Sequence, residues 1–325
     1  MYSRGIFIEF LRLEKDTQRT QEKEGLHMHI EIRNLNKTYP NGTHALKGVN
    51  LDIPMGMFGL LGPNGAGKSS LMRTIATLQE ADSGTISLGD MDVLKDKEKM
   101  RRMLGYLPQS FGVYQGVSAV KLLNHLAILK GITNRKERKE TVDYLLKQVN
   151  LYEVRHKAVS GYSGGMRQRF GIAQSLLGNP KVIIVDEPTA GLDPAERTRF
   201  LNLLSQISEQ SAIILSTHIV EDVSDLCPYM AIISDGQVML TGEPLKLMKE
   251  LKGRIWQYTI NRDSLPLYEE KYRLVFSRFF MGKIVVHIFS EDRPEPDFET
   301  LEPDLKDVYF CSLKGWLTPS DACSS

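Results

Sequence analysis

The segment Gly-Pro-Asn-Gly-Ala-Gly-Lys-Ser at residues 62–69 constrains this chain more than any other feature, because it matches the pattern GxxxxGK[ST] in full. It follows a short apolar run, residues 57–61, and precedes a stretch with helical spacing, residues 69–78. A glycine-rich loop between a strand and a helix turns backbone N–H groups toward phosphate oxygens, and the helix adds the positive end of its dipole. The alternative is a glycine-rich turn formed by chance, but such a turn has no reason to lie between a buried strand and a helix. The segment therefore predicts a site for a nucleoside triphosphate.

Two residues of this loop have distinct expected roles. Lys68 should reach the β- and γ-phosphates, and the hydroxyl of Ser69 should be a ligand of Mg²⁺. The remaining contacts to the phosphates are expected from the backbone of the loop and the start of the helix. The predicted nucleotide-binding residues of this segment are Gly62, Asn64, Gly65, Gly67, Lys68, Ser69 and Ser70.

A second pattern supplies carboxylates for the same chemistry. Residues 182–185 are all apolar, as in a strand buried on both faces, and Asp186 and Glu187 follow directly. Asp186 is predicted to hold the Mg²⁺ through water, and Glu187 to polarise the attacking water as a general base. The alternative is that both are solvated acids at a strand end. We favour the first interpretation because this pairing recurs in phosphoryl-transfer sites.

The rest of the chain alternates between strand and helix patterns. Apolar runs at residues 57–61, 182–185 and 212–216 suit buried strands of a mostly parallel sheet, and helical spacing intervenes at residues 69–78 and 195–208. We therefore predict an α/β nucleotide-binding core of the P-loop NTPase type.

Other segments lie outside this α/β pattern. Residues 118–159 have helical spacing and predict an insertion into the core, and residues 230–241 predict a closing hairpin. Beyond about residue 245 the pattern is β-rich, and Trp256, Phe279 and Phe280 are expected in the core there. The strands expected in this last region are residues 255–260, 274–280 and 283–289. The predicted domains are a peripheral extension over residues 1–27, the core over 28–245 with its helical subdomain at about 110–165, and an accessory α+β region over 246–325.

Composition excludes several other classes of protein. The 41 basic and 40 acidic residues give a net charge of +1, so a nucleic-acid partner is not expected. No apolar run approaches the roughly 20 residues that cross a bilayer. The three cysteines share no CxxC spacing, which is typical of a protein from a reducing compartment without a disulfide framework. If this protein works at a membrane, another chain must supply the membrane part.

At residues 163–168 the sequence Ser-Gly-Gly-Met-Arg-Gln resembles the signature motif of ATP-binding cassette (ABC) ATPases. Other motifs of that family are also present along the chain, in the order in which the family has them. Tyr39 resembles the aromatic residue that stacks on adenine, Gln109 the glutamine-loop residue, and His218 the switch histidine. Residues 191–193, Gly-Leu-Asp, resemble the D-loop. The resemblance covers about residues 28–245, and it implies ATP as the nucleotide and an antiparallel β subdomain beside the parallel sheet.

The resemblance also implies roles for these residues. The carbonyl of Gln109 can contact Mg²⁺ or the attacking water, and His218 can donate a hydrogen bond to the γ-phosphate. Tyr39 offers adenine a stacking surface, and the less favoured alternative is an ordinary strand residue. The residues expected to contact the γ-phosphate held by a second subunit are Ser163, Gly164 and Gly165.

Each chain would then hold one ATP at its own phosphate loop and contact a second ATP, bound by a partner, through its signature segment. The resemblance therefore implies a second ABC ATPase subunit, either another copy or a paralogue. The signature departs from the commonest form, LSGGQ, because Tyr162 replaces leucine and Met166 replaces glutamine. The serine and the glycines are intact, so contact with the phosphate should survive. Ser163 could also serve as an N-cap of the following helix, and the two roles are compatible.

The expected partner is an integral membrane permease formed by a separate chain, which would place this subunit in the cytoplasm on the inner face of the cell membrane. Residues 106–114 and 302–309 resemble stretches of cassettes that serve ABC-2-type exporters. The alternative is a soluble ABC ATPase acting in translation or DNA maintenance, but those carry two cassettes or long coiled coils, and this chain has one phosphate loop. The substrate, and export rather than import, are not determined by these patterns.

Overall fold

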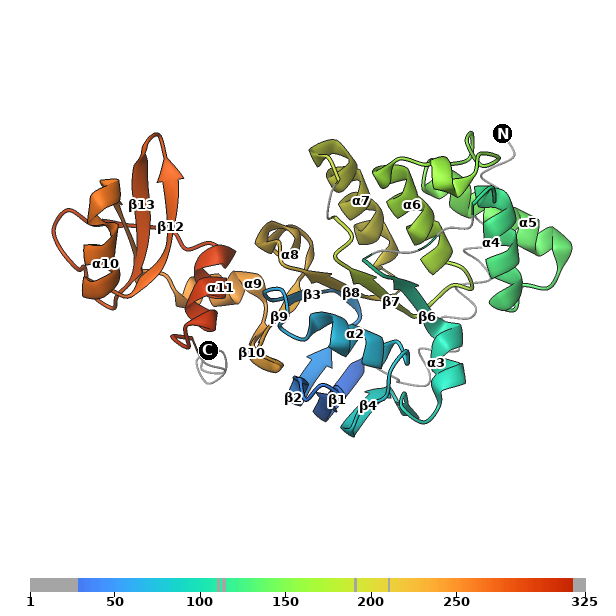
Figure 1. Ribbon diagram of the computed structural model, residues 1–325, viewed down its shortest axis with the longest axis horizontal. Helices are drawn as coiled ribbons and strands as arrows, with labels where there is room; N and C mark the ends of the chain where they lie inside the picture. Colours follow the sequence, from blue (N-terminus) through green and yellow to red (C-terminus); the bar gives the residue numbers. More distant parts are fainter. Residues whose placement is uncertain (1–28, 110–111, 113–114, 190–191, 210, 318–325) are drawn as a thin grey trace.

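In the computed structural model, the described residues are 29–109, 112, 115–189, 192–209 and 211–317. The predicted N-terminal extension, residues 1–27, lies outside them. The described residues form three sheets: the C-terminal sheet lies at one end of the longest axis of the molecule, and the other two lie one above the other in the body of the fold, with helices packed between and around them (Figure 1). Its helices are α2 (Lys68–Ile75), α3 (Lys97–Met103), α4 (Ala119–Leu129), α5 (Arg135–Gln148), α6 (Gly164–Ser175), α7 (Pro194–Ile207), α8 (Val220–Leu226), α9 (Pro244–Glu250), α10 (Leu265–Lys271) and α11 (Leu305–Leu313), with short 3₁₀ turns η1 (Val159–Gly161) and η2 (Arg262–Ser264).

The central sheet has the predicted, mostly parallel topology. Its strand order is β10-β9-β3-β8-β7-β6, and every pair is parallel except the closing hairpin β9–β10. The prediction of an α/β P-loop core is therefore confirmed. The strands are β3 (Gly56–Leu61), β6 (Leu104–Leu107), β7 (Val182–Asp186), β8 (Ala212–Thr217), β9 (Tyr229–Ser234) and β10 (Gln237–Gly242).

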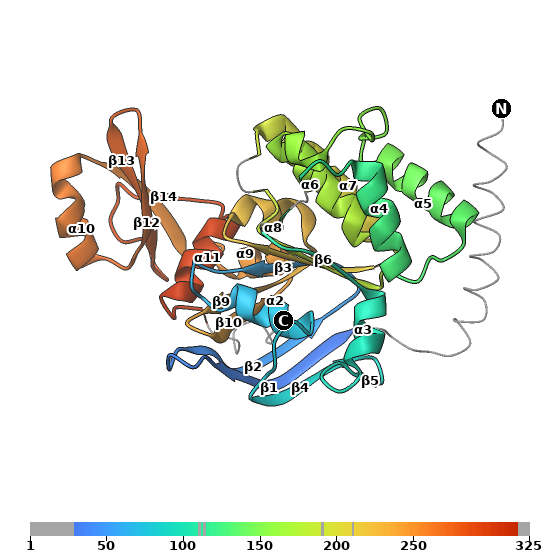
Figure 2. The ribbon, with the colours of Figure 1, turned by 45° about the vertical axis from the view of Figure 1, so that its right-hand side comes forward.

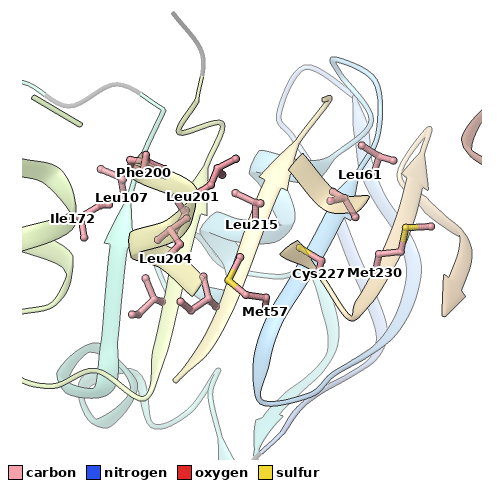
Figure 3. Close-up of a cluster of buried hydrophobic side chains, with 14 of the residues drawn as sticks. Met57, Leu61, Leu107, Ile172, Phe200, Leu201, Leu204, Leu215, Cys227 and Met230 are labelled. Atoms are coloured by element: carbon pink, nitrogen blue, oxygen red, sulfur yellow. The ribbon is translucent and has the colours of Figure 1, made fainter. Parts of the chain in front are cut away.

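The apolar runs of this sheet are buried on both faces, as their composition predicted. All residues of β7 are buried: Val182 and Ile184 face α2 and the antiparallel sheet, whereas Ile183 and Val185 face the helices on the opposite side. Phe200 of α7 belongs to the cluster on that second side (Figure 3). Burial on two faces fixes the positions of the strand ends, and the loops that carry the predicted site residues begin at these ends.

An antiparallel sheet covers the other face of α2. Its strand order is β2-β1-β4-β5, and it lies below the central sheet in Figure 2. This is the antiparallel β subdomain that the family resemblance implied. Its strands are β1 (Ile30–Thr38), β2 (His44–Ile53), β4 (Ser83–Leu88) and β5 (Met91–Asp92).

The helical insertion is also confirmed. α4 and α5 pack against each other and against α6, at the end of the molecule farthest from the C-terminal sheet (Figure 1). Their buried side chains continue the hydrophobic cluster of the central sheet. The boundaries proposed for this subdomain, and for the other domains, stay predictions.

A third sheet forms the β-rich C-terminal region. α10 packs on one face through an aromatic cluster, whereas α11 covers the other face and contacts α8 and α9 of the core. The expectation that Phe279 and Phe280 are core residues is wrong, because they are 70% and 52% exposed at the tip of the β12–β13 hairpin. Trp256 is partly buried, and its indole N–H donates to the carbonyl of Ser290 over 3.1 Å. The strands are β11 (Ile255–Ile260), β12 (Leu274–Phe280), β13 (Lys283–Phe289) and β14 (Glu299–Thr300).

Two further sequence expectations concern membranes and cysteines. Within the described ranges, no helix combines the length and the apolar character needed to cross a bilayer. Cys227 and Cys311 are buried free thiols, and Cys323 lies outside the described residues.

Candidate active site

The phosphate loop, residues 62–69, connects β3 to α2 and has little room for side chains. A Cβ on Gly62 would lie 2.2 Å from the carbonyl oxygen of Ile233, so only glycine fits. Gly67 has φ +103° at the start of α2, where a Cβ would also lie 2.5 Å from the carbonyl of Ala45. These two glycines let the backbone make the tight turn into α2, and Asn64 and Gly65 are exposed at the N-terminus of that helix, where phosphate binding is expected.

Lys68 is folded over the loop. Its ammonium group donates to the carbonyls of Gly62 at 2.7 Å and Pro63 at 3.0 Å, and the side chain is 5% exposed. Burial lowers the pKa of Lys68, and the nearby carboxylates of Glu187 and Asp186 oppose that shift. An incoming polyphosphate would add negative charge beside this desolvated cation, which strengthens the attraction.

The carboxylate of Glu187 is the point at which four sequence motifs meet. Gln109 donates from Nε2 to Oε2 of Glu187 over 3.0 Å, and Nδ1 of His218 lies 3.2 Å from Oε1. The ammonium of Lys68 is 3.8 Å from the same Oε1. The structure thus brings Lys68, Gln109 and His218 around a side chain that is only 12% exposed.

Asp186 and Ser69 provide oxygen atoms that suit a magnesium ion. Asp186 is 5% exposed, and its Oδ1 has no hydrogen-bond partner among the described residues. An orphaned buried carboxylate oxygen fits a bound cation or its water. Ser69 is exposed at the start of α2. Among the described residues, no group of three or more acidic, histidine or cysteine side chains is arranged to hold a metal ion by itself.

Tyr39 is anchored beside the loop by a hydrogen-bond chain that the sequence did not indicate. Its hydroxyl lies 2.9 Å from Oγ of Ser70 and donates to Oε1 of Gln79 at 3.0 Å. Gln79 also donates from Nε2 to the carbonyl of Ser70 at 2.9 Å. The ring of Tyr39 is therefore fixed against α2, and Gln79 is a supporting residue that sequence reasoning missed.

The signature segment begins α6. Ser163 is the N-cap, and its Oγ accepts from the backbone N–H of Met166 at 3.2 Å. Both Ser163 and Gly164 are exposed. The unusual Tyr162 is 4% exposed and donates to the carbonyl of Val154 at 3.0 Å, so it packs in the interior and leaves the serine and glycine accessible.

Asp193, the last residue of the D-loop segment, caps α7, where its Oδ1 accepts from the N–H of Glu196 at 2.9 Å. The side chain of Glu196 forms an ion pair with Arg169 of α6 at 2.9 Å. This pair connects the signature helix to the D-loop helix. Gly191 of the same segment lies outside the described residues.

Comparisons with known proteins agree with these motifs. The family model described as "ABC transporter" matches residues 46–190. The uncharacterized ABC transporter ATP-binding protein YxlF of Bacillus subtilis (strain 168) is 35% identical over 243 residues, which cover 74% of this chain and 80% of that protein. ABC transporter A family member 10 of Arabidopsis thaliana is 35% identical over 312 residues, or 91% of this chain, but the match spans only 33% of that longer protein.

Solved structures give the same result. The ATP-binding subunit of an ABC transporter superposes with a TM-score of 0.61 at 26% identity and covers 68% of this chain and 92% of its own. The dimeric, post-hydrolysis form of the cassette MJ0796 bound to ADP and Pi superposes with a TM-score of 0.61 at 27% identity and covers 66% and 98% of the two chains.

Proposed function

Because this chain belongs to the ATP-binding proteins of the ABC transporter family, it is an ATPase subunit that powers a transporter, and we propose which of its residues do this work. Lys68 binds the β- and γ-phosphates, Glu187 polarises the attacking water, and His218 donates to the γ-phosphate. The observation that carries this proposal is the convergence of Lys68, Gln109 and His218 on the carboxylate of Glu187.

Each of these side chains has a separate task in hydrolysis. Glu187 accepts a hydrogen bond from Gln109, which orients the carboxylate proposed as the proton acceptor. Gln109 can exchange this bond for one to the attacking water. Mg²⁺, held by Ser69 and Asp186, would neutralise charge on the phosphates. Tyr39 presents its ring to the adenine.

A second ABC ATPase subunit completes the site in this proposal. Ser163 and Gly164 are exposed at the start of α6, and the hydroxyl of Ser163 accepts a local hydrogen bond from the N–H of Met166 in the first turn of the same helix. These groups would bind the γ-phosphate held by the partner, which is another copy or a paralogue. Hydrolysis then removes the γ-phosphate that both subunits hold. The ADP that remains no longer favours the closed dimer over the open one, so the dimer can open.

A separate membrane permease is the proposed recipient of this conformational change. A cavity of about 390 Å³ lies between the core and the helical insertion. Leu78 and Leu129 on its lining are 60% and 70% exposed, and Tyr106 lies three residues before Gln109. An apolar segment of the permease bound in this cavity would contact the same stretch of chain that carries Gln109. A movement of Gln109 during hydrolysis could then be transmitted to the permease. In this proposal the subunit lies on the inner face of the cell membrane, and the resemblance to ABC-2-type cassettes supports export.

The test is co-purification with the permease. We expect wild-type protein to purify from native membranes with a multi-span membrane protein, and the variant Leu129→Glu to lose it. Leu129 is exposed, so the variant should fold. Leu267→Glu, at a residue 61% exposed on the C-terminal α10, is the matched control and should keep the partner. Recovery with ribosomes or DNA instead would contradict the proposal and favour a soluble ABC ATPase.

A further inference from the structure

Asp222 is a fully buried carboxylate on α8 that none of the motifs above includes. Its Oδ2 accepts a hydrogen bond from Oγ1 of Thr189 at 2.7 Å. Its Oδ1 accepts from Arg197, with Nε at 2.8 Å and the terminal nitrogen at 2.8 Å. Oγ1 of Thr217 also lies 3.5 Å from Oδ2. Asp222 therefore has partners on three other segments of the chain.

Each partner belongs to a segment that bears a site residue. Thr189 follows Glu187 by two residues, and Arg197 follows Asp193, the cap of α7, by four. Asp222 itself follows His218 by four. A single buried charge thus connects the carboxylate strand, the D-loop helix and the switch segment. Buried carboxylates persist only where donors compensate their desolvation, so these contacts hold the segments in one arrangement.

The backbone of Glu187 needs such support. Glu187 has φ +46°, a left-handed conformation that residues with a Cβ rarely adopt. Its N–H donates to the carbonyl of Ser216 at 2.9 Å, which fixes the chain before the turn. The Thr189–Asp222 bond fixes the chain just after it. Losing the second bond would let the turn relax and would change the direction of the Glu187 carboxylate.

We propose that Asp222 is a positioning residue for hydrolysis, which sets the orientation of Glu187 through Thr189 and couples it to the D-loop helix through Arg197. This inference rests on the role proposed for Glu187 as the general base. It assigns no contact with nucleotide to Asp222, which is fully buried on α8. Its effect should therefore fall on the chemical step and spare nucleotide binding.

The first test is Asp222→Asn, which keeps the shape of the side chain and removes its charge. We expect kcat for ATP hydrolysis to fall roughly 10- to 100-fold, the range expected for a displaced catalytic group, while KM changes less than about threefold. The matched control is Glu221→Gln on the adjacent residue, whose side chain is 52% exposed and pairs with Lys306. The control should retain wild-type kcat.

A second variant keeps the inference testable if Asp222→Asn fails to fold. Thr189→Val removes one hydroxyl but leaves the Asp222–Arg197 pair in place, and it should also lower kcat selectively. In the double variant Thr189→Val/Asp222→Asn the two losses should be less than additive, because both substitutions disturb the Thr189–Asp222 hydrogen bond. Turnover is normalised to the nucleotide-binding fraction, measured by fluorescent ATP titration.

The outcomes separate this inference from the proposed function. If Glu187→Gln abolishes turnover while Asp222→Asn and Thr189→Val keep wild-type kcat per binding site, the inference is wrong and the proposed function stands. If Glu187→Gln turns over normally, the proposed role of Glu187 as the general base is wrong, and the inference about Asp222 is overturned with it. A loss of activity in Asp222→Asn that matches its loss of nucleotide-binding protein would indicate a purely structural role and would also overturn the inference.

Discussion

The side-chain amide of Gln109 donates a 3.0 Å hydrogen bond to the carboxylate of Glu187, and the two residues follow the neighbouring parallel strands β6 and β7. Parallel strands end at the same edge of a sheet, so the register of β6 against β7 determines that the two side chains meet. Gln109 therefore restricts the orientation of the carboxylate that we propose as the general base.

Glu187→Gln should abolish turnover and preserve ATP binding. The substitution removes the proton acceptor but keeps the size of the side chain, and general-base catalysis contributes roughly 10²- to 10⁴-fold to a rate. Because the γ-phosphate would no longer leave, ATP should trap a dimer, which light scattering would detect. The control is Glu299→Gln on β14 of the C-terminal sheet, which should hydrolyse ATP and show no trapped dimer. Rapid turnover by Glu187→Gln would remove this residue from the role of base.

Lys68→Ala should lose most of the affinity for nucleotide. The ammonium of Lys68 already donates to two loop carbonyls, at 2.7 and 3.0 Å, so it is held at the loop before any phosphate arrives. A charged hydrogen bond contributes about 1.5–3 kcal/mol, equivalent to roughly 10- to 150-fold in Kd. Equilibrium titration with a fluorescent ATP analogue measures the change. Unchanged affinity would count against the assignment of the phosphate loop.

Cys227 and Cys311 should resist alkylation in the native protein. They are 4% and 0% exposed, and burial raises the pKa of both thiols to about 12. At pH 8 a thiol with such a pKa is ionised to about one part in 10⁴, and the thiolate is the reactive form. In a Cys323→Ser background, iodoacetamide labelling followed by mass spectrometry should be at least about 100-fold faster in urea than in buffer. Equal rates would show that one of the two sites opens readily.

Phe279 and Phe298 offer a matched test of burial within the C-terminal sheet. Phe298 is 1% exposed and its ring lies 5.1 Å from that of Tyr258, whereas Phe279 is 70% exposed. Phe298→Ala should cost about 3–5 kcal/mol of local stability, because it leaves a cavity. Phe279→Ala should change stability by less than about 0.5 kcal/mol. Hydrogen exchange of β11 and β13 measures both. A similar loss of protection in both variants would mean that the hairpin tip is covered in solution.

The phosphate loop and the carboxylate strand could be predicted because each is a short local pattern with one physical interpretation. Their apolar runs and glycines specify the strand, the turn and the helix without reference to distant residues. Phe279 was misassigned because an apolar strand pattern does not reveal that a hairpin extends beyond the helices that cover its sheet. Gln79 and Asp222 were missed for a different reason: each is a single polar residue whose partners come together only in the folded chain.

The ion pair between Lys306 of α11 and Glu221 of α8 should make a small contribution to stability that disappears in acid. The two charged atoms are 2.6 Å apart and join the C-terminal region to the helix that follows the switch histidine. The hydrogen bond from Lys306 lowers the pKa of Glu221 below its ordinary value of 4.5. A carboxyl with a depressed pKa in the folded state stabilises the protein above its unfolded pKa, and this stabilisation is lost as pH falls through the folded value.

The measurement is the difference in the free energy of unfolding between wild type and Lys306→Met as a function of pH. Because both side chains are about half exposed, at 43% and 52%, the difference should be only about 0.2–1 kcal/mol at pH 7. It should stay constant at pH values well above 4.5 and fall toward zero as pH drops through the lower pKa of folded Glu221, where the carboxylate becomes protonated. Lys283→Met, at the start of β13, is the control and should show no such acid-dependent difference. A difference that grows as pH falls would mean that Lys306 stabilises α11 by some other contact.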